Sequence, residues 1–217
     1  MKQLLRFFLK RSTWSIPYAI FLVGFVVLPL ILIFLYAFQD AEGNFTLANF
    51  SKFISSPEAA NTFVYSIGIA IITTVLCILL GYPAAWILAN KNLNRSAVTI
   101  VLFIMPMWIN ALMRTLATAE LFHMLGVQLG KGTLIVGMVY DYLPFMIYPI
   151  YNILNKMDKS YAEAAADLGA TPWQVFWKVQ VPLSMPGVIS GVMMVFMPTV
   201  STFAISEFLT NNKIKLF

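Results

Sequence analysis

Charged side chains are scarce in this sequence. Of its 217 residues only 11% are Asp, Glu, Lys or Arg, whereas 60% are hydrophobic. So few charges cannot cover a hydrophobic core with a water-soluble surface. The scarcity excludes an ordinary soluble domain and indicates a protein of the lipid bilayer.

Cysteine and histidine are nearly absent, with one residue of each. A single cysteine, Cys77, excludes a disulfide framework, and we interpret it as a small core residue. The single histidine, His123, has no H-E-x-x-H partner, so neither a metal site nor an intramembrane metalloenzyme is expected.

Motifs for ATP and for nucleic acid are missing as well. The sequence GKG at 130–132 lacks the earlier Gly of a Walker A motif and the Ser or Thr after its Lys. This chain is therefore not expected to bind ATP, and no cofactor is expected on it. The net charge is +5, but the basic residues outside the apolar runs form no stripe with interleaved aromatic residues. It predicts a membrane topology and no nucleic-acid partner.

Long apolar runs, by contrast, occur five times. A bilayer core of about 30 Å requires roughly 20 helical residues, and the runs are too continuous for the alternating strands of a barrel. The expected fold class is an all-α polytopic transmembrane helical bundle, with residues 1–217 as a single transmembrane domain. The expected spans are 16–38, 63–89, 99–121, 133–154 and 183–209.

The distribution of Lys and Arg predicts that the N-terminus is cytoplasmic. The opening MKQLLRFFLKRSTW leads into a span-length run without a cleavage site, so we expect an uncleaved first span. Basic residues in short loops tend to stay in the cytoplasm. The N-in topology leaves Lys52, Lys131, Lys213 and Lys215 outside, and places inside Lys2, Arg6, Lys10, Arg11, Lys91, Arg95, Lys156, Lys159 and Lys178.

Five spans from an inside start leave the tail TNNKIKLF outside the membrane. The chain stops directly after a span, and we therefore expect that a sixth span is missing and that the sequence is truncated at its C-terminus.

A polar connector, residues 155–182, separates the last two expected spans. Ser160 and Glu163 have the spacing of a capping box, and Gly169 can end the helix that this box begins. Both the resulting helix and the one after it are too short to cross a bilayer, so we expect them on the membrane surface.

The second connector helix is predicted from Thr171, with Pro172 at its first position and Gln174 completing another capping box. Pro182 is expected to stop it. Its aromatic face suits the lipid interface or the ends of neighbouring spans and consists of Trp173, Phe176 and Trp177.

The connector resembles the EAA loop of permease subunits of ABC importers. That loop reads E-A-A, three residues, G, nine residues, I-x-L-P, and the sequence here reads EAAADLG, nine residues, VQVP. In that family the loop docks in a cleft of a cytoplasmic ATPase. The resemblance implies five coupling residues, Glu163, Ala164, Ala165, Gly169 and Pro182. A purely local interpretation is that Glu163 caps its helix and Gly169 ends it.

The resemblance also implies partners and a location. They are a sister permease subunit, two copies of an ABC ATPase subunit, an extracytoplasmic substrate-binding protein and the bacterial cytoplasmic (inner) membrane. The spans around LANFSKF are similar to the first permease of spermidine/putrescine importers. Families for iron, thiamine, sulfate or molybdate share this layout and are alternatives. A self-sufficient ion-coupled secondary carrier is a further alternative.

Four charged residues lie at membrane depth: Arg114, Glu120, Asp141 and Glu207. Such groups are costly in lipid and usually face the bundle interior or water. A polyamine pathway needs acids and aromatic faces in place of water. The predicted pathway residues are Trp108, Glu120, Asp141, Tyr148 and Glu207. Alternatively the acids extend to the outer surface and Arg114 is a structural partner for one of them.

The fifth span begins with a G-x-x-x-G pattern at Gly187 and Gly191. This pattern predicts close packing between helices.

Overall fold

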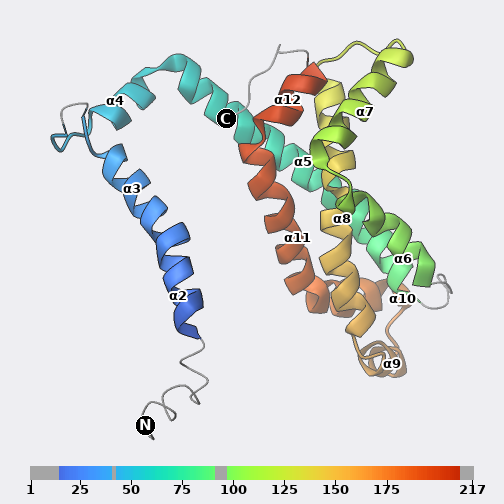
Figure 1. Ribbon diagram of the computed structural model, residues 1–217. Helices are drawn as coiled ribbons and strands as arrows, with labels where there is room; N and C mark the ends of the chain where they lie inside the picture. Colours follow the sequence, from blue (N-terminus) through green and yellow to red (C-terminus); the bar gives the residue numbers. More distant parts are fainter. Residues whose placement is uncertain (1–14, 41–42, 91–96, 211–217) are drawn as a thin grey trace, which may run out of the picture. The chain divides into compact units, whose positions relative to one another are not determined.

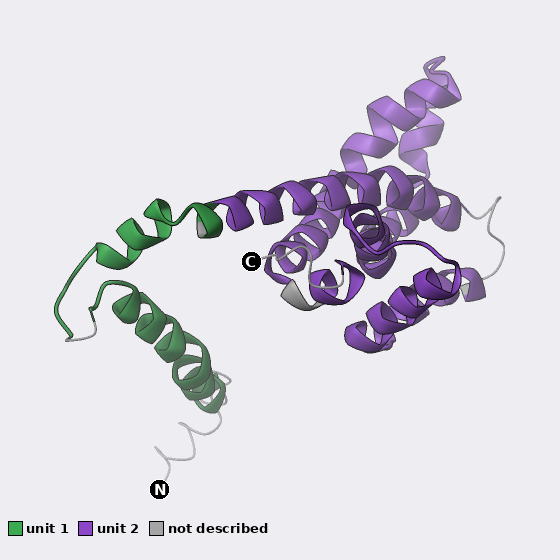
Figure 2. Cartoon of the chain, turned by 90° about the horizontal axis from the view of Figure 1, so that it is seen from above, with its two compact units in different colours: residues 1–60 green, residues 61–217 purple. Residues whose placement is uncertain are grey.

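The computed structural model describes residues 15–40, 43–90 and 97–210. These residues are helical apart from loops and one isolated β-bridge between Gln39 and Phe45. They form two compact units within residues 1–60 and 61–217 (Figure 2). The predicted inside charges at 2–11 and at 91–95, and most of the predicted outside tail, lie beyond the described residues.

The first unit is built around a rod of three helical segments, α2 Ile16–Leu22, η2 Val23–Val27 and α3 Leu28–Ala37. Together they form one candidate span, Ile16–Ala37, in which no side chain is buried. The side chain of Asn49, on α4 Ala48–Ser55, donates to the carbonyl of Gln39 at 2.9 Å, just beyond the C-terminal end of the rod.

The second unit contains the three longest helices. Its elements are α5 Pro57–Ala89, which begins in the first unit, α6 Ala97–Ile104, η3 Met105–Trp108, α7 Ala111–Met124, α8 Lys131–Lys156, α9 Ser160–Asp167, α10 Pro172–Val175, η4 Phe176–Gln180, α11 Val181–Ser201 and α12 Phe203–Thr210. Within this unit α7 and α12 lie at one end, and α9 and α10 lie at the other (Figure 1).

Helix α8 supplies buried side chains to both apolar clusters of the second unit. One cluster joins it to α5 and α11 through Cys77, Met146, Ile150 and Val195. The other joins it to α7 and α12 near Leu134. Both apolar clusters therefore lie along α8, and α5, α7, α11 and α12 pack around it.

The all-helical fold class is confirmed, but two predicted spans are broken. Among the described residues, four helices are long and apolar enough to cross a membrane, and a fifth span exists if one strongly bent pair is counted as one. That pair, Val98–Trp108 and Ala111–Met124, is bent by 96°. The prediction of one continuous helix over 99–121 is therefore wrong. The predicted span 183–209 is also interrupted, at Thr202 between α11 and α12.

The geometry at the break in the third span is set out by Pro106, Ile109 and Asn110. Pro106 lacks an N–H, and Ile109 has extended backbone, with φ −81° and ψ 139°. The next residue, Asn110, accepts hydrogen bonds through its side chain from the amides of Leu112 and Met113 at 2.9 and 3.5 Å. Asn110 thus starts α7 as a new helix with its own N-cap.

The predicted close packing at the G-x-x-x-G pattern is confirmed. A Cβ added to Gly187 would lie 2.9 Å from the carbonyl oxygen of Pro149, and one added to Gly191 would lie 2.7 Å from Sδ of Met146. Both neighbours belong to α8. The absence of side chains at these two glycines allows the backbones of α8 and α11 to approach closely.

We predict that Gly187→Ala destabilises the second unit by about 1–3 kcal/mol, because the new methyl group would meet backbone atoms that cannot move aside. Thermal unfolding in detergent, followed by circular dichroism, measures the loss. Gly68→Ala is the matched control, since nothing lies within 4 Å of a Cβ built there. Equal unfolding midpoints for the two variants would contradict the prediction.

Candidate functional site

Helix α9 begins one turn after α8 ends, and its N-terminus differs from the predicted capping box. The N-cap position is Lys159 rather than Ser160. The Ser160 amide donates to Oδ1 of Asp158 at 2.9 Å, and this hydrogen bond lowers the pKa of the exposed Asp158 carboxyl below its usual value. Asp158 thus bonds the Ser160 amide, which the side chain of Glu163 would bond in the predicted capping box.

The C-terminus of α9 is the turn predicted at Gly169, which has φ +81°. Its amide donates to the carbonyl of Ala166 at 2.9 Å, and the amide of Ala170 donates to the carbonyl of Ala165 at 3.0 Å. These two bonds form a Schellman motif, which requires a left-handed residue at the position of Gly169. The turn between α9 and α10 is thus fixed by backbone hydrogen bonds.

The second connector helix has the predicted cap but not the predicted end. Thr171 and Gln174 form a reciprocal capping box, with N···O distances of 2.9 and 3.4 Å. Pro182 does not stop the helix, which runs from Pro172 to Ser201 without a break. In η4 the register changes to the π type, so that the amide of Val181 donates to the carbonyl of Phe176. The register change at Val181 directly precedes Pro182, which has no N–H to donate.

The predicted coupling residues lie mostly on an open surface. Glu163, Ala164 and Gly169 are exposed and Ala165 is half-buried. Leu168 follows them and is 90% exposed. Pro182 is also exposed, but it lies in the first turn of α11 and not on α9.

Two hydrogen bonds, one helical turn apart, fasten the α10–η4–α11 helix to α5. The indole Nε1 of Trp86 donates to Oε1 of Gln180 at 2.7 Å. The hydroxyls of Tyr82 and Ser184 lie 2.8 Å apart and share a second hydrogen bond. The ring of Phe176 meets the rings of both Tyr82 and Trp86 edge to face, with centroids 5.8 Å apart.

A cavity of about 620 Å³ lies beside this junction. It is bounded by residues from the C-terminal ends of α5 and α8, by Gln180 and by α9. Ala162 and Glu163 line its α9 side, and Trp86 lines its α5 side. Helix α9 is therefore separated from part of the bundle by space rather than by packed side chains.

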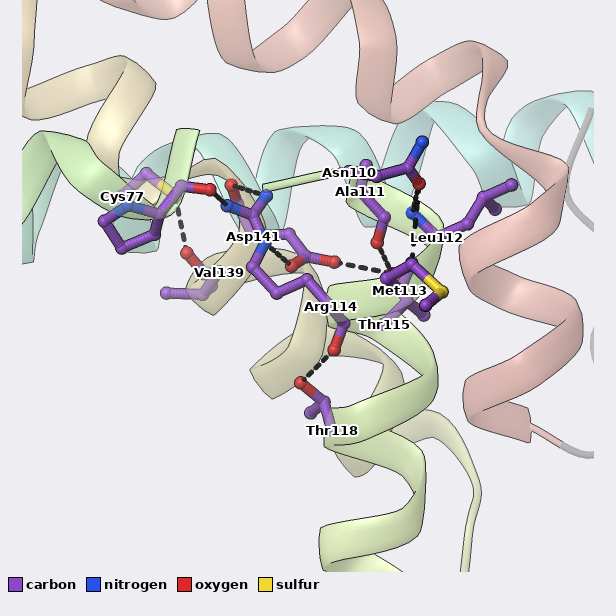
Figure 3. Close-up of polar contacts among 11 residues, drawn as sticks. Cys77, Asn110, Ala111, Leu112, Met113, Arg114, Thr115, Thr118, Val139 and Asp141 are labelled. Atoms are coloured by element: carbon purple, nitrogen blue, oxygen red, sulfur yellow. Dashed lines mark hydrogen bonds and ion pairs between the residues drawn. The ribbon is translucent and has the colours of Figure 1, made fainter. Parts of the chain in front are cut away.

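Two of the four charges at membrane depth, Arg114 and Asp141, form a buried ion pair between α7 and α8 (Figure 3). Nε of Arg114 lies 2.6 Å from Oδ1 of Asp141, and the two side chains are 5% and 1% exposed. The hydroxyl of Thr115 lies 2.9 Å from the other carboxylate oxygen, Oδ2. Both oxygens of the acid thus have a donor, as a charge in this environment requires.

The remaining donors of Arg114 go to backbone carbonyls. Nη1 donates to the carbonyl of Pro106 at 2.6 Å, and Nη2 donates to the carbonyl of Asp141 at 2.8 Å. The first carbonyl lies in η3, two residues before its end, and the second lies in α8, three residues before Pro144. One guanidinium therefore connects backbone groups near two prolines in different helices.

The other predicted pathway residues are placed separately from this pair. Glu120 on α7 and Glu207 on α12 are both exposed, and these two helices pack against each other. Trp108 is 87% exposed beside the break, and Tyr148 is 41% exposed on α8. The structure thus buries Asp141 and leaves the other four predicted side chains accessible.

Sequence reasoning missed Thr115 as a partner of Asp141, and it missed the two contacts from α5. Thr115 follows Arg114 directly, so a hydroxyl beside an intramembrane charge was an available signal. Trp86 and Gln180 lie in different spans, 94 residues apart. No local pattern connects them.

Comparison with known proteins gives a consistent result. Residues 78–216 match the family described as binding-protein-dependent transport system inner membrane component. The spermidine/putrescine transport system permease protein PotB of Escherichia coli is 34% identical over 88% of this chain and 78% of its own length. PotB of Haemophilus influenzae is 30% identical over 90% of this chain and 76% of its own length. A PotB homolog of Mycoplasma genitalium is 27% identical over 94% and 76%.

We predict that Arg114→Met and Asp141→Asn each destabilise the second unit by about 3–5 kcal/mol, because each leaves a buried group without its partner. The double variant Arg114→Met with Asp141→Asn should lose less than the two single losses added together, since neither charge is then stranded. Unfolding in detergent measures all three. Glu120→Gln is the exposed control and should change stability by less than about 0.5 kcal/mol. Strictly additive losses would contradict the coupling.

Proposed function

Because this chain belongs to the family of binding-protein-dependent transport system inner membrane components, we propose that it forms half of the translocation pathway of an ATP-driven polyamine importer. Family membership makes it a multi-pass inner-membrane permease and a non-catalytic subunit. It also implies an ATPase and a binding protein as partners. The proposed assembly contains a sister permease, two ATPase subunits and an extracytoplasmic binding protein.

The exposed helix α9 carries the coupling part of the proposal. A helix that docks on an ATPase needs an accessible face and a fixed connection to the spans. Glu163 and Ala164 supply the exposed face, and the Schellman turn at Gly169 supplies the connection. Glu163, Ala164, Ala165 and Gly169 are therefore proposed to contact the ATPase, and Pro182 to act through the helix that continues from it.

The end of the bundle that bears α9 is proposed to face the cytoplasm. Lys156 ends α8, and Lys159 and Lys178 lie in the connector that follows. Lys131 lies at the opposite end of α8. This excess of positive charge on one side supports the orientation that the charge rule predicts.

The hydrogen bonds that Arg114 makes favour a cation over an anion as the substrate. An anion permease would need this guanidinium free to meet sulfate or molybdate, but its Nε and both terminal nitrogens are already bonded. The exposed acids, Glu120 and Glu207, have no ion-pair partner among the described residues. We propose that these two acids receive the amine groups of a polyamine.

The exposed aromatic rings give the cation a path beyond those acids. Trp108 and Tyr148 can offer ring faces to an amine that has lost part of its water. Asp141 is proposed to contribute differently, by holding Arg114 so that its charge does not repel the substrate. The similarity to spermidine/putrescine permeases supports the same substrate class.

The coupling role can be tested with Gly169→Val and Glu163→Lys in the assembled complex. A β-branched residue is strained at φ +81°, so we predict about tenfold weaker ATPase association and a matching loss of uptake. Gly132→Val is the control, since Gly132 is exposed, has open space around its Cβ position and lies at the other end of α8. Undiminished uptake by both α9 variants at normal expression would remove α9 from the mechanism.

The substrate can be tested by uptake of labelled spermidine, putrescine and sulfate into vesicles that contain the whole complex. Glu120→Gln and Glu207→Gln should each lower polyamine uptake about fivefold, because a partly exposed charge pair contributes up to about 1 kcal/mol. Glu58→Gln makes the same charge change in the first turn of α5 and serves as the control. Transport of sulfate alone, or polyamine uptake that both variants leave unchanged, would refute the cation pathway.

A further inference from the structure

Helix α9 is connected to α11 by a turn and then by one continuous helix. From the turn at Gly169 the chain enters a helix that runs from Pro172 to Ser201 without a break. A displacement of α9 can therefore reach α11 along this helix. The cavity of about 620 Å³ between α9 and the ends of α5 and α8 gives α9 room to move.

The helix changes its register where it meets α5. Segment η4, Phe176–Gln180, is π-helical, and its backbone bonds span five residues instead of four. Such a turn is wider and less favourable than an α-helical one, and π turns occur often at functional sites. Here it lies between α10, which adjoins α9, and α11, which packs on α8.

The two hydrogen bonds to α5 lie at this register change, but they differ in burial. Tyr82 and Ser184 are both buried inside the bundle. Trp86 and Gln180 are half-buried, and both line the cavity. The inner bond holds α11 against α5, whereas the outer bond is placed where α9 can move relative to the spans.

We propose that the Trp86–Gln180 hydrogen bond is the pivot that converts displacement of α9 into rotation of α11 against α5. Trp86 and Gln180 are positioning residues in this scheme, because neither belongs to the proposed ATPase contacts of α9 or to the proposed pathway residues. With the outer bond in place, α10 and η4 turn about Gln180 and carry α11 with them. Without it, η4 slides along α5 and the displacement is lost. The inference rests on the proposed coupling through α9.

The test is the ratio of substrate transported to ATP hydrolysed by the complete importer in proteoliposomes. Trp86→Phe removes the donor but keeps an aromatic ring against Phe176, and Gln180→Leu removes the acceptor. We expect each to lower the ratio about five- to tenfold, in keeping with the loss of one hydrogen bond, while ATPase association stays normal. The double variant should be no worse than either single variant, because both remove the same bond.

Two further variants separate a pivot from a general packing effect. Trp177→Phe makes the same substitution on an exposed ring of η4 and should keep the wild-type ratio. Gln180→Glu retains an acceptor oxygen for the indole and should restore most of the ratio that Gln180→Leu loses. A packing role would not distinguish the two Gln180 variants.

The outcomes distinguish failure of the pivot from failure of the coupling function. If Gly169→Val lowers uptake but Trp86→Phe keeps the wild-type ratio, the pivot is refuted and the coupling function stands. If Gly169→Val has no effect, the coupling function fails first. If Gln180→Leu does not assemble, the ratios of Trp86→Phe and Gln180→Glu decide the question. A wild-type ratio for Trp86→Phe overturns the proposal. A ratio for Gln180→Glu as low as that of Trp86→Phe overturns it as well.

Discussion

The arrangement of the second unit depends on one charge that cannot be left alone in a membrane. A guanidinium in hydrocarbon requires a counter-ion and an acceptor for each donor that faces the protein. Arg114 meets this requirement with the carboxylate of Asp141 and with carbonyls of two helices. The same contacts hold α7 next to α8 and bond the broken end of η3. Satisfying the charge and fixing the bend are thus achieved by the same atoms.

A second consequence concerns how charge is distributed along the proposed pathway. The Arg114–Asp141 pair is neutral as a unit and buried, so the exposed acidic charges on α7 and α12 are those of Glu120 and Glu207. Exposed acids can release a cation as readily as they bind it, because water competes for both partners. A transporter needs this property, since a site that binds too tightly stops transport.

Local sequence signals predicted those parts of the structure whose causes are local. The capping box at Thr171 and the turn at Gly169 each depend on residues within one or two helical turns, and both were found. The close packing at Gly187 followed from side-chain size alone. The fold class followed from hydropathy, because hydropathy indicates whether a segment lies in lipid or in water and does not depend on its tertiary contacts.

The misplaced boundaries have causes that lie far along the chain. Pro83, Pro144 and Pro186 lie inside continuous helices, whereas the third span breaks just after Pro106. The difference is that the carbonyl of Pro106 has an alternative donor in Arg114, and the pairing of Arg114 depends on a residue in the next helix. Pro182 failed as a stop signal, because the helix continues from η4 into α11 through it. Neither fact can be read from the residues around the proline.

The broken third span also has a consequence for biosynthesis. At 1.5 Å per residue, the 14 residues of α7 reach only about 21 Å, less than the thickness of the hydrocarbon core. Arg114 leaves the ribosome 27 residues before Asp141, so its counter-ion does not yet exist when the segment first enters the membrane. The segment is therefore expected to insert as an unbroken hydrophobic helix and to bend only after α8 has followed it. The 96° break would then form late in assembly, once Asp141 of the newly synthesised α8 can pair with Arg114.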